Sequence, residues 1–379
     1  MNLMDWLVLL AIALAGLYLV IGLGLTFWPE PVSTKKSSPK PRVAVLIAMR
    51  NEQHYISQCL SALEKQTYPQ HLFDVFVLDD ASTDDSPQIA RQFSERNANF
   101  FVVRINSVYA NLKGKMNVLA RGLKSLNHDI VLITDADCIV PETWVENMVS
   151  YFTPETGMVG GFTSLFPFSD IKPATAKNNL FARIQALDWA FLQAMNALNS
   201  HFGKPISILG NNFGFRLKAY REVGGFENIG FSVTEDFALL EAIRKKTSWK
   251  IVHTIDKNNA IYSHPLPDLK SFFQQRLRWI QGGRAMRPWG YFVTFFSVTT
   301  HFLVFFNWIT HFTELIAYLP FILLFLTDFF VLLRPLKRLQ LTRLFKDFWA
   351  FELFYFAYLF IFSLLGIFPQ KIVWKGRKL

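Results

Sequence analysis

Residues 129–138 read DIVLITDADC, and this stretch decides the fold of the 379-residue chain. Ile130–Ile133 is a short apolar run, which predicts a buried strand. The strand ends at Asp135 and Asp137, two carboxylates at alternate positions. Open α/β sheets bind ligands beyond the carboxyl ends of their strands, and Mg²⁺ typically takes one or two carboxylates together with phosphate oxygens. The stretch therefore predicts a metal and diphosphate site, with a solvated strand end as the alternative when Asp-x-Asp is considered alone.

Three earlier apolar runs also predict strands, and helical patterns separate them: Val43–Met49, Phe73–Leu78 and Phe100–Val103. Strands about 30 residues apart with helices between them predict right-handed βαβ units and a mostly parallel sheet. The first strand is followed by Arg50-Asn51-Glu52 and the second by Asp79-Asp80. These polar clusters and the Asp135 pair should therefore converge along one edge of the sheet and form a site.

The patterns in the second half of the chain are less regular. Lys172–Ser200 predicts a long helix with four core residues at helical spacing: Leu180, Ile184, Leu187 and Phe191. Gly210–Gly214 and Gly224-Gly225 predict tight backbone sites. Thr234-Glu235-Asp236 opens a further helix, where Thr234 as an N-cap with acids in the first turn is a purely structural alternative.

Three apolar regions predict membrane helices. Residues 3–27 exceed the ~20 residues needed to span a bilayer, and the absence of a basic n-region argues against a signal peptide. Residues 291–333 have room for two spans with a turn near His311–Glu314, and Asp328 is expected to snorkel near Arg334. Residues 348–368 predict a further span or a re-entrant element, because the basic tail after it conflicts with the topology.

The net charge of +10 is concentrated beside these apolar segments. The basic residues involved are Lys35, Lys36, Lys40, Arg42, Arg276, Arg278, Arg284, Arg287, Arg334, Lys337, Arg338, Arg343 and Lys346. This positive-inside pattern predicts that residues 30–290 face the cytoplasm. We therefore expect a membrane surface and an anionic substrate as partners, and no nucleic acid. Cys59 and Cys138 are expected in the core, since no Cys and His spacing suggests a metal site.

Pro267–Met286 predicts an amphipathic helix at the membrane interface. Its apolar stripe comprises Leu269, Phe273, Leu277 and Ile280. Gln275, Arg278 and Trp279 are spaced at i, i+3 and i+4, which places them together on another face. Trp and Arg as simple bilayer anchors are the alternative interpretation.

Four clusters thus stand in one order: Asp79-Asp80, Asp135-Ala136-Asp137, Thr234-Glu235-Asp236 and Gln275-Arg276-Leu277-Arg278-Trp279. This series resembles the membrane-bound family 2 glycosyltransferases, which include cellulose, chitin and hyaluronan synthases and the ceramide glucosyltransferases. The match covers residues 41–284, with no departure in the four motifs. The resemblance implies an α/β fold of the GT-A type, with one N-terminal and two to three C-terminal transmembrane helices. It also implies a nucleotide-diphosphate sugar, with a UDP-sugar expected, and inversion at the anomeric carbon.

The resemblance further implies a role for each motif residue. Ala48, Arg50, Glu52 and Asp79 would surround the base and ribose of the donor, with Asp80 beside them and Lys115 near the diphosphate, unless Lys115 is only a solvated helix start. Asp135 and Asp137 would handle the sugar-ribose side and a divalent metal, Mg²⁺ or Mn²⁺. Asp236 would be the catalytic base, with Glu235 beside it. Gln275, Arg278 and Trp279 would close over the diphosphate and the acceptor entrance.

The chemistry of the residues agrees with these roles. A carboxylate such as Asp236 can take the proton of an attacking hydroxyl. The negative charge that develops on the leaving diphosphate can be stabilised by a metal at Asp137 and by the guanidinium of Arg278. Direct displacement of this kind requires no covalent intermediate.

The acceptor is expected to be a membrane lipid of the cell envelope, because few apolar segments are available to build a polymer channel. The alternatives are a processive polysaccharide synthase and a non-enzymatic, membrane-tethered nucleotide-binding protein. We expect a multi-pass protein of a bacterial-type inner membrane. Its expected segments are a transmembrane helix at 1–28, a linker at 29–42, a catalytic domain at 43–265, an interfacial helix at 266–288, a transmembrane hairpin at 291–333, a basic loop at 334–347, a transmembrane or re-entrant helix at 348–368 and a basic tail at 369–379.

Overall fold

The computed structural model describes residues 3–34, 39–171, 173, 178–368, 373–374 and 377–378. The chain forms two compact units, each of which we describe by itself. The sheet unit comprises Glu30–Lys177 and Asn199–Pro265, and the helical unit comprises Met1–Pro29, Asn178–Leu198 and Leu266–Leu379. Lys35, Lys36 and part of the basic tail lie outside the described residues. The expected segment boundaries and their functional labels remain predictions.

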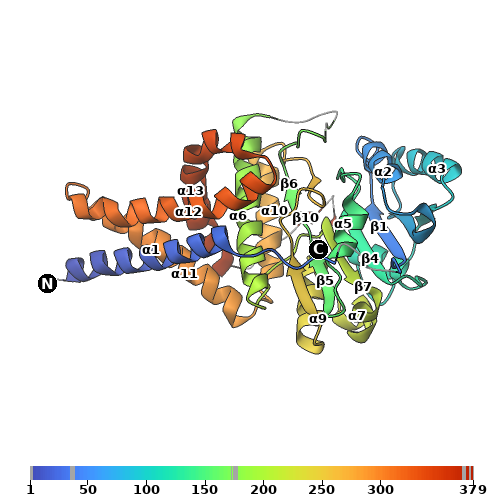
Figure 1. Cartoon of the computed structure of the whole chain (residues 1–379), viewed down its shortest axis with the longest axis horizontal. Coiled ribbons are helices and arrows are strands. Elements are labelled where there is room, and N and C mark those ends of the chain that lie inside the picture. The colour runs from blue at the N-terminus through green and yellow to red at the C-terminus, as the bar shows by residue number, and fades with distance from the viewer. Residues whose placement is uncertain are drawn as a thin grey trace. The chain divides into compact units, whose positions relative to one another are not determined.

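The sheet unit is built on a seven-stranded sheet in the order β3-β2-β1-β4-β7-β5-β8 (Figure 1). Its strands are β1 Val43–Met49, β2 Phe73–Asp79, β3 Phe100–Arg104, β4 Ile130–Asp135, β5 Thr156–Gly160, β7 Asn212–Arg216 and β8 Lys250–His253. All neighbouring strands are parallel except those that pair with β7, which is antiparallel to β4 and β5. The predicted, mostly parallel sheet is confirmed. Strands β5, β7 and β8 were not predicted. In β7 the Asn and Gly residues do not resemble an apolar run.

Helices cover both faces of this sheet. They are α2 Ile56–Glu64, η1 Gln70–Leu72, α3 Ser86–Arg96, α4 Gly114–Leu123, α5 Trp144–Ser150, α7 Leu217–Glu222, α8 Gly225–Ile229 and α9 Glu235–Lys246, and a small pair β6 Thr163–Ser164 with β9 Ile261–Tyr262 completes the unit. In β4, Ile130 and Leu132 belong to one core, whereas Val131 and Ile133 belong to the core on the opposite face. Successive side chains of a strand point to opposite faces, so a strand covered on both sides must be apolar at every position.

His253, at the end of β8, supplies a pH-dependent contribution to stability. Burial lowers the pKa of its imidazole to about 4, whereas an exposed histidine titrates near ~6.5. The unfolded chain therefore binds a proton that the folded chain excludes, and the stability present above pH ~6.5 is lost as the pH falls towards the folded value. By pH ~5 this loss should reach about 2 kcal/mol.

Thermal unfolding followed between neutral pH and pH ~5 should therefore show a falling melting temperature in the wild-type protein. The variant His253→Gln should flatten that profile, whereas His71→Gln, which changes an exposed histidine, should leave it unchanged. A profile of the same slope in the His253→Gln protein would refute the assignment.

Among the residues that the structure describes, the helical unit has four helices long and apolar enough to cross a membrane. Its elements are α1 Leu3–Phe27, most of α6 Leu180–His201, α10 Leu269–Gly283, α11 Pro288–Thr310, η2 Leu315–Ala317, α12 Tyr318–Arg338, η3 Thr342–Asp347, α13 Phe348–Ile367 and the pair β10 Val373–Trp374 with β11 Arg377–Lys378. In this unit α1 packs against α11 and α12 (Figure 1). The predicted turn near residues 311–314 is confirmed, since α11 ends at Thr310.

Two details of the predicted helices are wrong. Helix α6 begins at Leu180 rather than at Lys172, because the side-chain oxygen of Asn179 accepts a hydrogen bond from the Ala182 N–H at 2.8 Å and caps the helix. Leu180 is 47% exposed and not in the core, whereas Ile184, Leu187 and Phe191 are buried as predicted. Residues 172 and 174–177 lie outside the described part of the chain.

Asp328 does not snorkel towards the helix end. It is completely buried, and its Oδ2 lies 3.6 Å from Nε2 of His301 on α11. Neighbouring helices cover this face of α12, so the carboxyl group meets other side chains instead of the bilayer surface.

Gly22 sets the spacing between α1 and α12. A Cβ atom at Gly22 would lie 2.9 Å from the Thr327 side chain and 3.1 Å from its carbonyl oxygen. Nearby, the Thr26 hydroxyl donates to the Phe330 carbonyl at 2.9 Å. Because a larger residue must separate the two backbones, Gly22→Leu should lower the melting temperature of the purified protein by several degrees, consistent with the ~1–3 kcal/mol typical of overpacking.

Gly24→Leu is the matched control, since nothing lies within 4 Å of a Cβ atom at Gly24. Equal melting temperatures for the Gly22→Leu and Gly24→Leu proteins would contradict close packing of α1 on α12.

Candidate active site

Three adjacent strands bring their carboxyl ends to one level of the sheet. Met49 of β1 pairs with Asp79 of β2, and Ala48 of β1 pairs with Asp135 of β4. The two carboxylates therefore flank the end of β1, one on each side. This edge is where open α/β sheets bind ligands, and it holds the polar clusters that the sequence predicted to converge.

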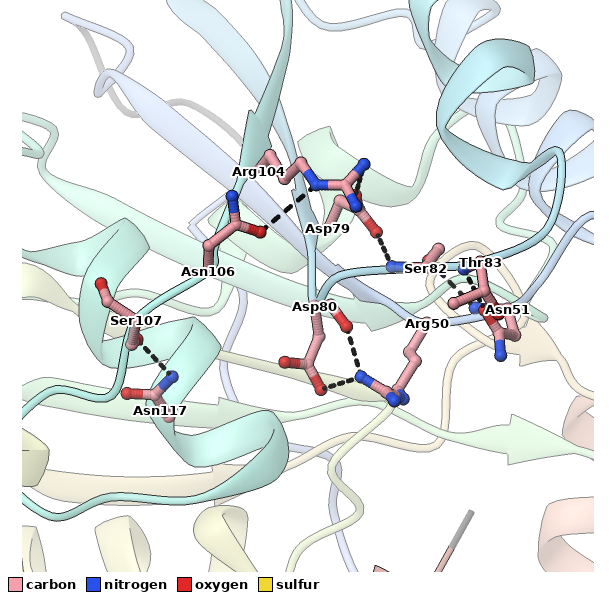
Figure 2. A network of polar contacts seen from close by, with 10 residues as sticks. All are labelled: Arg50, Asn51, Asp79, Asp80, Ser82, Thr83, Arg104, Asn106, Ser107 and Asn117. Atoms are coloured by element: carbon pink, nitrogen blue, oxygen red, sulfur yellow. Dashed lines mark hydrogen bonds and ion pairs between the residues drawn. The ribbon is translucent and has the colours of Figure 1, made fainter. Parts of the chain in front are cut away.

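Figure 2 shows how Asp79 and Asp80 differ in their surroundings. One guanidinium nitrogen of Arg50, Nη1, donates to the Asp80 carbonyl at 2.6 Å and lies 3.4 Å from the Asp80 carboxylate. Asp79 is buried, and its Oδ1 accepts a hydrogen bond from the Ser82 N–H at 2.9 Å. Its Oδ2 lies 3.8 Å from Arg104 and has no hydrogen bond with the described residues. Asp79 thus retains an acceptor atom, whereas Asp80 holds Arg50 in place.

The loop after β1 is fastened to the loop after β2 (Figure 2). Asn51, at φ 53°, adopts the left-handed conformation that Asn tolerates well. Its N–H donates to the Ser82 hydroxyl at 3.1 Å, and its side-chain oxygen accepts from the Thr83 N–H at 2.9 Å. The next N–H, of Glu52, donates to the Ser86 hydroxyl at 2.7 Å. These bonds position Arg50 and Glu52 at the strand ends.

Lys115 joins the first and second halves of the sheet unit. Its Nζ lies 2.7 Å from the Asp135 carboxylate and 2.9 Å from the Glu235 carboxylate, and it donates to the Gly210 carbonyl at 2.9 Å. Burial by itself would lower the pKa of Lys115, but the charges and hydrogen bonds of Asp135 and Glu235 raise it overall. Lys115 is therefore a partly buried cation paired with two carboxylates, and its interpretation as a solvated helix start is wrong.

Asp236 lies in the same cluster. A Cβ atom at Gly210 would be 2.8 Å from Oδ2 of Asp236 and 3.2 Å from Oε1 of Glu235, so only glycine permits this approach. The Oδ1 of Asp236 accepts a hydrogen bond from the Phe237 N–H at 2.8 Å. Thr234, the N-cap of α9, makes no side-chain capping bond. Glu235 and Asp236 nevertheless occupy the first turn of α9, as the structural alternative expects. Glu235 also shares Lys115 with Asp135 at the end of β4.

Burial raises the pKa of the Cys59 thiol on α2, and the negative charges of Asp137, Asp135 and Glu52 raise it further. Both cysteines are buried as predicted. Within the described residues, no three His, Cys, Asp or Glu side chains are arranged to hold a metal ion. A metal here would be held by Asp135 or Asp137 together with oxygens of the donor diphosphate, which suits Mg²⁺ and similar ions.

Gln275, Arg278 and Trp279 lie on α10, in the helical unit. The side-chain oxygen of Gln275 accepts a hydrogen bond from Arg276 at 3.1 Å, and the Trp279 ring lies 5.7 Å from that of Trp189. Leu269 and Phe273 of the predicted apolar stripe are exposed, as a membrane-facing stripe requires, while Phe272 and Arg276 form the buried face.

Several residues at these sites were not predicted. The His264 ring packs 4.6 Å from that of Tyr55 and 5.0 Å from that of Tyr262, and Tyr262 pairs with Ile139, just after Asp137. Asp188 pairs with Arg276, a residue that the sequence places in the basic flank of the membrane segments and in the Gln275–Trp279 cluster without a predicted partner. No local pattern marks the Tyr55–His264 and Asp188–Arg276 contacts, because each joins segments far apart in the chain.

Comparison with known proteins agrees with this fold and motif order. Beta-monoglucosyldiacylglycerol synthase of Synechocystis sp. is 27% identical over 264 residues, which cover 68% of this chain and 51% of that protein. Poly-beta-1,6-N-acetyl-D-glucosamine synthase of Staphylococcus epidermidis is 24% identical over 254 residues, covering 64% of this chain and 55% of that protein. The chain therefore spans about half the length of these curated relatives.

Among solved structures, a mannosyltransferase from Pyrobaculum calidifontis in complex with GDP-Man and Mn²⁺ matches with a TM-score of 0.55 and 18% identity, covering 96% of this chain and 99% of that one. This likeness confirms the GT-A fold. The sequence model described as glycosyl transferase family 21 matches residues 7–379. The expected relationship to family 2 and ceramide glucosyltransferase-like enzymes is thereby confirmed, and the chain belongs to glycosyl transferase family 21.

Proposed function

We propose that this protein transfers a sugar from a nucleotide-diphosphate donor to a hydroxyl group of a membrane lipid, with inversion at the anomeric carbon. The observation that carries the proposal is the cluster of Asp135, Lys115, Glu235 and Asp236, joined through Gly210. It brings the diphosphate end of the site next to a carboxylate able to act as a base. A protein that only bound the donor would have no need for a carboxylate able to act as a base.

In this proposal each residue acts on a defined part of the reaction. Asp79 accepts a hydrogen bond from the base of the donor, because its Oδ2 is buried and lacks one. Asp236 takes the proton of the acceptor hydroxyl as that oxygen attacks the anomeric carbon. The Lys115 ammonium lies beside Asp135 and Glu235 and keeps their negative charge from opposing the departing diphosphate.

Asp135 and Asp137 suit a divalent ion, since Mg²⁺ is typically bound by one or two carboxylates together with water and phosphate oxygens. A bound Mg²⁺ or Mn²⁺ would supply positive charge beside the diphosphate. The side chain of Arg278 is chemically suited to the same charge, because a guanidinium grips phosphate oxygens in two places.

A lipid acceptor is supported by two features. The first is the printed name of the Synechocystis relative, a synthase of a glucosylated diacylglycerol. The second is the first half of the apolar stripe of α10, where Leu269 and Phe273 are exposed while Leu277 and Ile280 are partly buried. Exposed apolar side chains suit a helix lying at headgroup level. Polymer synthesis remains the second candidate, favoured by the similarity to a poly-N-acetylglucosamine synthase. With residues 30–290 at the cytoplasmic face, a bacterial inner membrane is the expected location.

The test is to supply membranes containing the full-length protein with labelled nucleotide sugars, beginning with UDP-glucose. Label that enters an organic extract as a lipid carrying a single sugar would support the proposal, and membranes lacking the protein are the control. A long, water-soluble product would favour polymer synthesis instead. Donor binding without any transfer would support a non-enzymatic role.

A further inference from the structure

Arg276 and Asp188 form an ion pair buried inside the helical unit. Arg276 is 1% exposed and Asp188 is fully buried. The Nη2 of Arg276 donates to Oδ2 of Asp188 on α6. Removing one partner of such a pair leaves an uncompensated buried charge, whereas an apolar pair of similar volume is often as stable or more so. Stability alone therefore gives little reason for two charges at this place.

The guanidinium of Arg276 contacts two of the three side chains that the family resemblance places over the donor and acceptor. Its Nη1 donates to the Gln275 side-chain oxygen at 3.1 Å, and its carbon Cζ lies 4.1 Å from the centre of the Trp279 ring. Asp188 thus holds a cation that in turn holds Gln275 and Trp279. Trp189, the neighbour of Asp188, lies against the other side of this arrangement at 5.7 Å from the Trp279 ring.

Arg278, two residues further along α10, is in a different situation. It is only partly buried, and within the described part of the chain its guanidinium makes no hydrogen bond or ion pair. Residues two apart point to different sides of a helix. The two arginines of this segment therefore have separate tasks: Arg278 is available to a ligand, whereas the donors of Arg276 are directed into the protein.

We propose that Arg276, held by Asp188, is a positioning residue that orients Gln275 and Trp279 for sugar transfer. The expected effect on the rate of sugar transfer rests on the proposed function, whereas the expected effect on the orientation of Gln275 and Trp279 does not. A misplacement of about 1 Å can cost roughly 100-fold in rate, so the pair can influence transfer without touching the substrate.

The kinetic test compares this pair with a second ion pair of α6. Arg183 and Asp347 lie 2.7 Å apart, also join α6 to a later element, and contact none of the motif residues. We expect Arg276→Lys and Asp188→Asn to lower kcat roughly 10- to 100-fold, with a smaller change in KM for the donor. Arg183→Lys and Asp347→Asn should change kcat by less than about 2-fold while lowering the melting temperature to a similar degree.

A neutral pair separates positioning from stability. The double variant Asp188→Asn, Arg276→Gln removes both charges and should recover most of the melting temperature lost in Asp188→Asn. Its kcat should stay low, because Gln is too short to stack on Trp279. Recovery of kcat together with the melting temperature would overturn the proposal, since the pair would then matter only for folding.

A second readout does not depend on activity. In protein labelled with 5-fluorotryptophan, the ¹⁹F resonance of Trp279 can be assigned from its loss in Trp279→Phe. Asp188→Asn should shift or split this resonance, while Asp347→Asn should leave it unchanged. An unmoved resonance would overturn the positioning role. A wild-type protein that transfers no sugar, yet shows the shift, would overturn the proposed function and not the contact.

Discussion

Replacing Asp236 by Asn should lower the rate of sugar transfer by about 10²- to 10⁴-fold, the usual contribution of a general base. Asn keeps the size of the side chain beside Gly210, but it cannot take the proton of the acceptor hydroxyl. Donor binding should persist, because Asp79 ends β2 and Arg50 follows β1, whereas Asp236 lies on α9. Initial rates with labelled donor and a separate titration of donor binding measure both effects.

Glu95→Gln is the matched control, since it makes the same change of acid to amide at an exposed site on α3. Its transfer rate should equal that of the wild-type protein. An Asp236→Asn protein with a normal rate would exclude this carboxylate as the base, and the mechanism would need another proton acceptor.

Replacing Lys115 by Met should abolish transfer and lower the melting temperature by about 10 °C. The change leaves Asp135 and Glu235 without their shared cation, and loss of one partner of a buried ion pair costs about 3–5 kcal/mol, which corresponds to a few degrees per kcal/mol in a protein of this size. Because the pKa of Lys115 is raised, this contribution is fully present below pH ~10 and is lost only as the pH rises further.

Two variants make this result specific. Lys113→Met changes an exposed lysine of the same segment and should leave the transfer rate and the melting temperature unchanged. The double variant Lys115→Met, Glu235→Gln removes one of the two acids that lose their partner, so it should recover part of the melting temperature without recovering transfer. Equal melting temperatures for Lys115→Met and its double variant would contradict charge imbalance as the cause.

The strands β1 to β4 and the membrane helices were predictable because their signals are local. A run such as Ile130–Ile133 must be apolar at each position to be buried on both faces, and it ends where the carboxylates begin. The helices α1, α11, α12 and α13 were predictable for a similar reason, since spanning a bilayer requires a long apolar segment. The order of the four motifs then pointed to the family that the comparison confirmed.

The incorrect or missing predictions concern features that no local signal in the sequence marks. Strand β7 was missed because it is recognised by its place between β4 and β5 and not by its composition. Asp328 was expected at a helix end, yet its burial depends on helices that pack over it. The same holds for Arg276, whose partner Asp188 lies 88 residues away in the chain.

The amino-acid sequence by itself determined the alternation of strands and helices, the apolar spans and the residue types at the strand ends, because these depend on burial within each segment. Only the tertiary structure decided that Lys115 bridges Asp135 and Glu235, that Gly210 brings Asp236 to them, and that Arg276 is buried while Arg278 is not. The physical reason is that a charge is neutralised or left available by its neighbours in space, and those neighbours come from segments that no local pattern connects.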